Sequence, residues 1–204
     1  MNRIPTLLAI LMVFPLIVTG PLLHSGQEKE SCPPITALLI IDIQEFYFPG
    51  GSLPLVNPLA ASQNAKIILG KFRENNWLVV HVRHNAKSGA GIHVNVKPLK
   101  GEKVISKDHA NSFKDTDLLD HLRQHRVKRL VIVGMQTHMC VEAAIRAASD
   151  LGFQCILVQD ACATRDLNYQ GRVISSEDVH YSTLSTLSRT YARVIDTPTF
   201  MKEF

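Results

Sequence analysis

Residues 37–42 read Ala-Leu-Leu-Ile-Ile-Asp, an unbroken apolar run that ends at a carboxylate. A short, branched apolar run without polar alternation is typical of a β-strand that is covered on both faces. Similar runs recur along the rest of the chain, at residues 78–82, 103–105, 130–133, 155–158 and 192–195. The sequence therefore predicts six buried strands, of which residues 37–42 contain the first.

Stretches with helical periodicity lie between these runs. They cover residues 61–75, 117–125 and 141–151, where apolar side chains recur every three or four positions. Strands that alternate with helices predict right-handed crossovers and a mainly parallel sheet with helices on both faces. We therefore expect an α/β fold, a three-layer α/β/α sandwich around a six-stranded, mainly parallel sheet. The common Rossmann-like strand order for such a sheet is 3-2-1-4-5-6.

The composition of the 204-residue chain fits one folded domain, with 46% hydrophobic and 20% charged residues. The formal net charge of +4 is spread along the sequence. The nearest approach to a basic cluster is Lys97, Lys100 and Lys103, and no aromatic residues are interleaved with it. A nucleic-acid partner would call for a sustained basic face, so we expect a small-molecule substrate and no nucleic acid.

The first 30 residues differ from the rest. Arg3 precedes an apolar run at residues 4–18, and a polar, charged stretch follows at residues 27–31. This layout predicts an export signal, or a membrane anchor if it is not cleaved, over residues 1–30. The folded domain would then cover residues 31–204. We expect a periplasmic or secreted protein, or attachment to the inner membrane through residues 4–18 if the segment stays in place.

The chain has four cysteines and no Cys-x-x-Cys pair. That spacing excludes a zinc ribbon and a thioredoxin-type redox motif. An exported protein with an even cysteine count can form a disulfide, and the sequence leaves open whether Cys32, Cys155 or Cys162 is paired.

Three polar residues follow predicted strands and converge on one edge of the sheet. Asp42 follows the first strand, Lys107 follows the third, and Cys140 lies six residues beyond Gly134 at the end of the fourth. In open α/β sheets, ligands bind beyond the carboxyl ends of the strands, where the strand order reverses. Strands one and four are neighbours at that reversal, so we expect Asp42 and Cys140 to face each other.

These residue types form a sufficient set for nucleophilic attack on a carbonyl. Cys140 opens the predicted helix at residues 141–151, and a helix N-terminus favours the thiolate. Asp42 can accept the thiol proton, and Lys107 can hold the anionic pair or a developing oxyanion. The alternative for Cys140 is a small buried hydrophobic residue with no chemical role.

Four linked segments resemble the isochorismatase-like hydrolases. Residues 37–46 are similar to the opening strand of that family, an apolar run followed by Asp, any residue and Gln. Lys107 with Ser112 and Phe113 resembles its lysine loop. The other two are residues 133–141, which are similar to the nucleophile loop, and residues 160–166, which are similar to a later strand end. The resemblance covers roughly residues 36 to 197, in the same order and spacing.

The resemblance implies Asp42 as general base, Lys107 as its charge partner and Cys140 as nucleophile. It also implies a cis peptide between Met135 and Gln136, with the backbone N–H groups of Gln136 and Cys140 aimed at the oxyanion. An acyl- or carbamoyl-thioester would form at Cys140, and water would release the acid. Similar proteins are often dimers or larger, so we expect a homo-oligomer.

Two more residues near strand ends, Gln44 and Arg83, are candidates for substrate contact, like Gln136. Each could instead cap or pair without touching substrate. Family members that hydrolyse nicotinamide carry an Asp-x-His metal site after strand two, where this chain reads His84-Asn85-Ala86. We therefore expect no metal and no cofactor.

Three functions remain open from the sequence. The first is a cysteine hydrolase of a small amide or ureide, and the second is an enol-ether hydrolase of the isochorismatase kind. The third is a catalytically idle binding or assembly module of the same fold. The intact set of Asp42, Lys107 and Cys140 favours the first.

Overall fold

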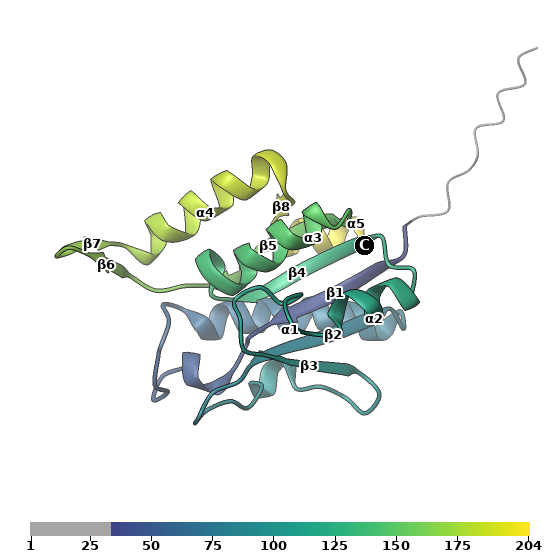
Figure 1. The fold of residues 1–204 in the computed structure, drawn as a ribbon, viewed down its shortest axis with the longest axis horizontal. Coiled ribbons are helices and arrows are strands. Elements are labelled where there is room, and N and C mark those ends of the chain that lie inside the picture. The colour runs from purple at the N-terminus through teal and green to yellow at the C-terminus, as the bar shows by residue number, and fades with distance from the viewer. Residues whose placement is uncertain (1–33) are drawn as a thin grey trace, which may run out of the picture. The chain divides into compact units, whose positions relative to one another are not determined.

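The computed structural model describes residues 34–204 (Figure 1). The export signal or anchor expected at residues 1–30 lies outside the described residues, as does Cys32, so both remain predictions. Among the helices of residues 34–204, none is long and apolar enough to cross a membrane.

A six-stranded parallel sheet forms the centre of the described chain, in the order β3-β2-β1-β4-β5-β8. Its strands are β1 (Thr36–Ile41), β2 (Leu78–His84), β3 (Lys103–Lys107), β4 (Arg129–Met135), β5 (Gln154–Ala163) and β8 (Arg193–Ile195). The predicted order 3-2-1-4-5-6 is confirmed, because β8 is the sixth strand of this sheet. The strands β6 (Leu167–Tyr169) and β7 (Arg172–Ile174) pair only with each other, as a hairpin.

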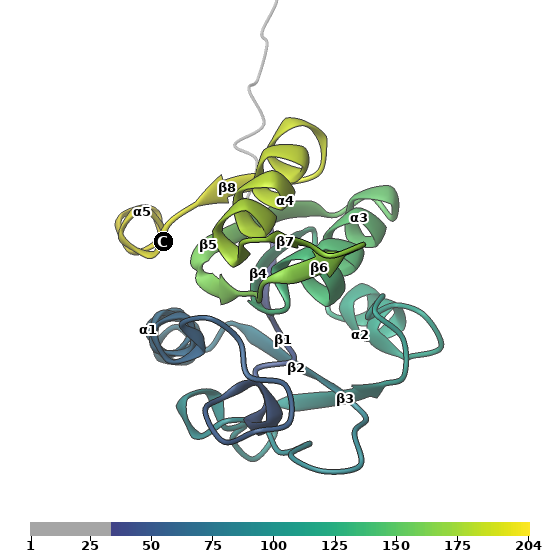
Figure 2. The same cartoon turned by 90° about the vertical axis from the view of Figure 1, so that its left-hand side faces the viewer.

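Helices cover both faces of the sheet, which confirms the three-layer sandwich (Figure 2). One face carries α1 (Pro58–Glu74) and α5 (Thr197–Glu203), and the other carries α2 (Leu118–Gln124), α3 (Glu142–Asp150) and α4 (Ser176–Thr190). The protein has one apolar cluster on each face of the sheet, and the alternation of side chains along β1 contributes residues to both. Leu38 and Ile40 belong to one apolar cluster, and Leu39 and Ile41 belong to the other.

The β6–β7 hairpin and the helices α4 and α5, all near the C-terminus, were not expected from the sequence. The hairpin has a two-residue turn in which Gln170 and Gly171 both have positive φ, at 52° and 81°. The helix α4 is rich in serine and threonine, which weakens its helical signal, yet Ser175 caps it by accepting a hydrogen bond from the Asp178 N–H.

The register of the parallel strands places Asp42, Lys107 and the segment that leads to Cys140 at the same edge of the sheet. Ile41 lies beside both Val82 and Gly134, and His84 lies beside Lys107. The residue after β1, the end of β3 and the segment after β4 therefore meet at the carboxyl edge of the sheet.

Gly134 allows β4 to lie unusually close to β1. Its φ is 143°, and a Cβ at this position would stand 2.1 Å from the carbonyl oxygen of Ile41. No side chain fits at that distance unless the backbone of one strand moves. The glycine lies just before the turn that carries Cys140, so the approach of the two strands sets the position of that turn.

We predict that Gly134→Ala lowers the free energy of unfolding by about 3 kcal/mol or more, because the new methyl group collides with backbone. The matched control is Gly70→Ala, in the middle of α1, where a Cβ meets nothing within 4 Å. That variant should gain about 0.5–1 kcal/mol from helix propensity. Urea unfolding measures both, and equal stability of the two variants would contradict this account of Gly134.

Candidate active site

Asp42, Lys107 and Cys140 meet in a buried cluster. Lys107 Nζ donates to Asp42 Oδ2 at 2.7 Å and to Cys140 Sγ at 3.2 Å. The three residues are 0%, 1% and 7% exposed. The structure thus brings together the three residues expected from the sequence, with the lysine in contact with both of the others.

Strand geometry explains how the ammonium group reaches this place. Lys107 is on β3 and Asp42 follows β1, so β2 lies between them and the separation is about 9.5 Å, or two strand spacings. Only a long side chain can bridge that distance. His84, which ends β2, lies alongside the lysine chain, with its Nδ1 3.4 Å from Nζ.

Asp42 is held by its backbone as well as by the lysine. Its N–H donates to the Val82 carbonyl at 2.9 Å, and its φ of 49° is in the left-handed region. That conformation turns the chain sharply as β1 ends. Within residues 34–204, the second carboxylate oxygen, Oδ1, is buried and has no hydrogen-bond partner. Asp42 therefore has a free position for a proton.

Cys140 lies in a π-helical turn, Thr137–Val141, that leads directly into α3. The Gln136 carbonyl accepts hydrogen bonds from the Met139 and Val141 N–H groups, at 3.1 and 3.3 Å. The peptide bond between Met135 and Gln136 is cis, as the resemblance implied. Cys140 was expected to open a helix. In the structure it lies in a wider turn that comes just before α3.

Burial changes the predicted ionisation of the nucleophile. Desolvation, reinforced by the nearby Asp42 charge, raises the pKa of Cys140 to about 12, although Lys107 acts in the opposite direction. Burial thus opposes the stabilisation of a thiolate that was expected from the helix N-terminus, and it favours a neutral thiol at rest. Desolvation also raises the pKa of Asp42, against the opposing effect of Lys107. A carboxylate with raised proton affinity suits the removal of a proton from a neutral thiol.

Gln136 is held beside the turn by two residues from other segments. Its Nε2 donates to the Tyr47 hydroxyl at 3.3 Å, and its Oε1 accepts from Arg165 Nε at 3.2 Å. Tyr47 belongs to the short 3-10 helix η1 (Glu45–Tyr47), and burial raises the pKa of its hydroxyl. Arg165 is half-buried and has no carboxylate partner among the described residues.

Gln44 and Arg83 have other partners in the structure. Gln44 is fully buried, and its amide donates to the His84 and Ala90 carbonyls while accepting from the His84 N–H. It therefore fixes the end of β2 and the loop beyond it. Arg83 donates to Ser106 Oγ at 2.9 Å, and alternation along β2 points it to the sheet face opposite His84. The structure thus supports the alternative roles left open for these two residues.

His84, Tyr47 and Arg165 lie at the site but were not among the site residues expected from the sequence. The position of His84 could have been predicted from the alternation of side chains along a strand. His84 shares a sheet face with Val80 and Val82, and it lies at the end of its strand. Arg165 lies in the quoted segment at residues 160–166, but nothing in that pattern predicts its contact with Gln136. Tyr47 carries no signal in the sequence beyond its nearness to Asp42.

Residues 34–204 contain neither a cluster of metal donors nor a disulfide. Within that range, no group of three or more His, Cys, Asp or Glu side chains is placed to hold a metal ion. Cys140, Cys155 and Cys162 are all free thiols. Cys155 and Cys162 therefore do not form a disulfide bond with each other.

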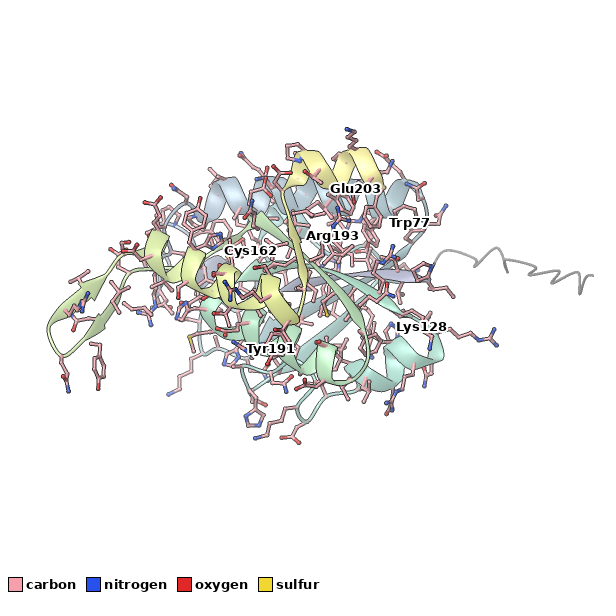
Figure 3. All side chains as sticks on the ribbon, turned by 90° about the horizontal axis from the view of Figure 1, so that it is seen from above. Trp77, Lys128, Cys162, Tyr191, Arg193 and Glu203 are labelled. Atoms are coloured by element: carbon pink, nitrogen blue, oxygen red, sulfur yellow. The ribbon has the colours of Figure 1, made fainter. Side chains whose placement is uncertain are left out.

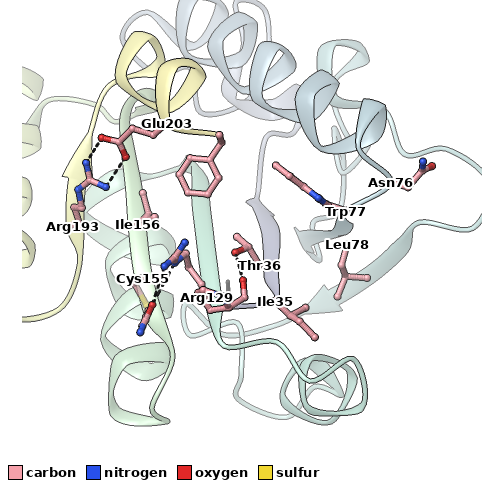
Figure 4. A pocket seen from close by; sticks show the side chains of 13 residues that line it. Ile35, Thr36, Asn76, Trp77, Leu78, Arg129, Cys155, Ile156, Arg193 and Glu203 are labelled. Atoms are coloured by element: carbon pink, nitrogen blue, oxygen red, sulfur yellow. Dashed lines mark hydrogen bonds and ion pairs between the residues drawn. The ribbon is translucent and has the colours of Figure 1, made fainter. Parts of the chain in front are cut away.

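A cavity of about 750 Å³ lies at the opposite, amino-terminal edge of the sheet (Figure 4). Trp77, Arg129 and Phe204 are among its lining residues, and the Arg193–Glu203 ion pair closes one side. Figure 3 shows Trp77, Arg193 and Glu203 at this end of the molecule, far from the hairpin. The reactive side chains of Asp42, Lys107 and Cys140 lie at the other edge of the sheet, away from this cavity.

The profile of the isochorismatase domain matches residues 36–197. The chain belongs to the isochorismatase family. An isochorismatase family protein of Bacillus subtilis (strain 168), YddQ, is 42% identical over 178 residues, which are 82% of this chain and 99% of that protein. The crystal structure of an isochorismatase from Pseudomonas putida KT2440 is 31% identical, with a TM-score of 0.78 over 82% of this chain and 93% of the other.

Two more distant relatives are named for the compounds that they hydrolyse. A streptothricin hydrolase of Streptomyces noursei is 31% identical over 66% of this chain and 56% of its own length. The maleamate amidohydrolase of Pseudomonas putida is 29% identical over 63% of this chain and 72% of its own length. Members of the isochorismatase family are hydrolases, and some of them cleave C–N bonds.

We predict that iodoacetamide alkylates Cys140 of the native protein slowly at pH 7. With a pKa of about 12, the thiolate fraction is on the order of a thousandfold below that of an ordinary cysteine. Because the pKa lies far above the tested range, the rate should rise about tenfold per pH unit between pH 7 and 9. Peptide mapping by mass spectrometry identifies the labelled residue, and the urea-unfolded protein is the control. Fast, pH-independent labelling of native Cys140 would mean that a thiolate is already formed.

Proposed function

We propose that the protein is a cysteine-dependent amidohydrolase that cleaves the C–N bond of a small amide or ureide through a thioester at Cys140. The observation that carries this proposal is the contact of Lys107 Nζ with both Asp42 Oδ2 and Cys140 Sγ, at 2.7 and 3.2 Å. A nucleophile, a base and a cation in mutual contact at the ligand-binding edge of the sheet are the components of nucleophilic acyl transfer.

In the first half of the reaction, Asp42 accepts the thiol proton on Oδ1 as Sγ attacks the substrate carbonyl carbon. A C–S bond forms, and negative charge develops on the carbonyl oxygen. The backbone N–H groups of Gln136 and Cys140 are the proposed donors to this oxyanion. When the tetrahedral intermediate collapses, the C–N bond breaks and the leaving amine takes the proton from Asp42.

In the second half, water attacks the thioester and gives a proton to Asp42. The C–S bond breaks, the acid leaves, and the proton returns to Sγ. The sum is one amide and one water converted to one acid and one amine, with the three residues restored. Lys107 stabilises negative charge on Asp42 in the resting state and on sulfur during attack. Its contact with both groups suits both tasks.

The alternatives receive less support. An enol-ether hydrolase needs no nucleophilic thiol, so the contact between Cys140 and the Asp42–Lys107 pair would have no purpose in it. An idle binding module would have no reason to bury a lysine and an aspartate together, since a buried ion pair is often less stable than apolar residues of the same volume. The similarity to maleamate amidohydrolase also favours C–N hydrolysis.

Arg165 favours a substrate that carries a carboxylate. Its guanidinium contacts Gln136, in the segment that leads to Cys140, and it has no acidic partner within the described part of the chain. Half-buried arginine forms strong bidentate hydrogen bonds to carboxylates. A small amide with an acid group a few bonds from the scissile carbonyl would satisfy it.

We predict that Cys140→Ala abolishes ammonia release from such amides while the fold is kept. The substrate panel pairs each carboxylate-bearing amide with a neutral analogue, and the charged member of each pair should be the better substrate. The matched control is Cys155→Ala, because Cys155 is also buried with a pKa raised to about 12 but bonds only to backbone carbonyls near α3.

The rates should separate the two variants clearly. The Cys155→Ala variant should keep most of the wild-type rate, and Cys140→Ala should lose at least about a thousandfold. If Cys140→Ala keeps more than a few per cent of the wild-type rate, Cys140 is not the nucleophile. Circular dichroism confirms that both variants are folded.

A further inference from the structure

The cavity at the amino-terminal edge of the sheet has no part in the proposed reaction. Its volume of about 750 Å³ is within the range of roughly 300–1,000 Å³ that is usual for small-molecule sites. It opens among the first residues of β1, β4 and β5, beside the ends of α1 and α5 (Figure 4). The ends of hydrogen-bonded strands therefore give it rigid walls.

Apolar side chains make up much of the wall. Trp77 and Phe204 lie edge to face, with ring centroids 6.4 Å apart and an interplanar angle of 77°. Ile156 is buried at 5% exposure, whereas Ile35 is 49% exposed. Leu78 adds further aliphatic surface. Apolar surface that lines a hollow of this size suits the apolar body of a ligand, which would remove it from water.

Arg129 is one of two arginines at the cavity, and it has no acidic partner within the described chain. Its Nε and Nη2 both donate to Gln154 Oε1 at 3.4 Å, which is long for a hydrogen bond. None of the ion pairs among residues 34–204 includes it. The other arginine, Arg193, is paired with Glu203. The cavity therefore carries one uncompensated positive charge beside its apolar wall.

We propose that this cavity is a binding site for a monocarboxylic acid with an apolar body. The carboxylate accepts hydrogen bonds from the guanidinium of Arg129, and the apolar body packs against Trp77, Phe204 and Ile156. A planar guanidinium matches the two oxygens of a carboxylate better than it matches the single amide oxygen of Gln154. This inference concerns binding alone and does not depend on the proposed reaction.

The charges around the cavity favour an acid over other ligands. A cationic ligand would meet Arg129 and Arg193 with only Glu203 to offset them. A neutral ligand would leave the guanidinium of Arg129 without an anion. A ligand with a second acid group would need a second free cation, but both terminal nitrogens of Arg193 already donate to Glu203. One carboxylate on an apolar body is the combination that this lining complements.

The fluorescence of Trp77 reports on this cavity, because Trp77 is the single tryptophan of the chain and lines the cavity. The probe is decanoate, which does not absorb where tryptophan is excited or emits. Titration of the full-length protein should shift the emission to shorter wavelength in a saturable way, because the ligand displaces water from the indole. Decanoate bound at the other edge of the sheet, near Cys140, would leave this emission unchanged.

Two variants test the role of Arg129. Arg129→Gln should weaken decanoate binding about tenfold or more, because charge-assisted hydrogen bonds to the carboxylate are lost. The matched control is Lys128→Gln, which removes the same charge from the next residue, outside the cavity. Its dissociation constant should stay within about twofold of the wild-type value, because an exposed charge is screened by salt. Thermal melting establishes that each variant is folded.

Decanol tests the need for the carboxylate in the wild-type protein alone, whatever the variants do. It has the same chain without the charge, so it should bind at least about tenfold more weakly than decanoate. Emission that does not respond to decanoate, decanol binding as tight as that of decanoate, or equal affinity of Arg129→Gln and Lys128→Gln for decanoate would overturn the proposal.

Discussion

The interaction on which the site depends is the hydrogen-bonded contact of Lys107 with Asp42 and Cys140 inside the protein. A buried ammonium group is very unfavourable unless a charge partner and hydrogen-bond acceptors surround it. Asp42 supplies the charge at 2.7 Å, and Cys140 supplies a further acceptor at 3.2 Å. Removing one member of a buried ion pair costs about 3–5 kcal/mol in comparable proteins, so each of these residues constrains the others.

Much of the local structure serves to bring these three groups together. Asp42 takes a left-handed φ of 49° directly after a strand, and Gly134 admits an Ile41 carbonyl that no other residue would tolerate. Gln44 fixes the end of β2 through two hydrogen bonds to the backbone of His84, which keep His84 beside the lysine, and a third holds the loop at Ala90. The result is a thiol that is neutral at rest and a base with a free oxygen beside the cation. Such a site holds its nucleophile protonated until a substrate carbonyl gives the thiolate somewhere to react.

The sheet and the three central residues could be predicted from the sequence because each depends on a local signal. Buried parallel strands appear as apolar runs, and strand ends are where α/β folds place polar ligand-binding groups. The hairpin was missed because its turn uses Gln170-Gly171 rather than the common Asn-Gly or Asp-Gly pairs. The helix α4 was missed because Ser and Thr dominate its exposed face.

The ionisation of Cys140 and the roles of Gln44, Arg83 and Arg165 depend on what surrounds each side chain in three dimensions. A helix N-terminus favours a thiolate in isolation, but the depth at which Cys140 is buried decides its pKa, and sequence does not give that depth. Gln44 stands two residues after Asp42, as a substrate-binding residue could, yet its amide is used on the backbone of β2. Only the structure separates these possibilities.

The most direct test of the central claim is mass spectrometry of the protein quenched with acid during turnover of a carboxylate-bearing amide. We predict an adduct with the mass of the acyl group on the peptide that contains Cys140, and its loss on treatment with hydroxylamine, as expected of a thioester. Steady turnover with Cys140 unmodified at every quench time from milliseconds onward would contradict the account.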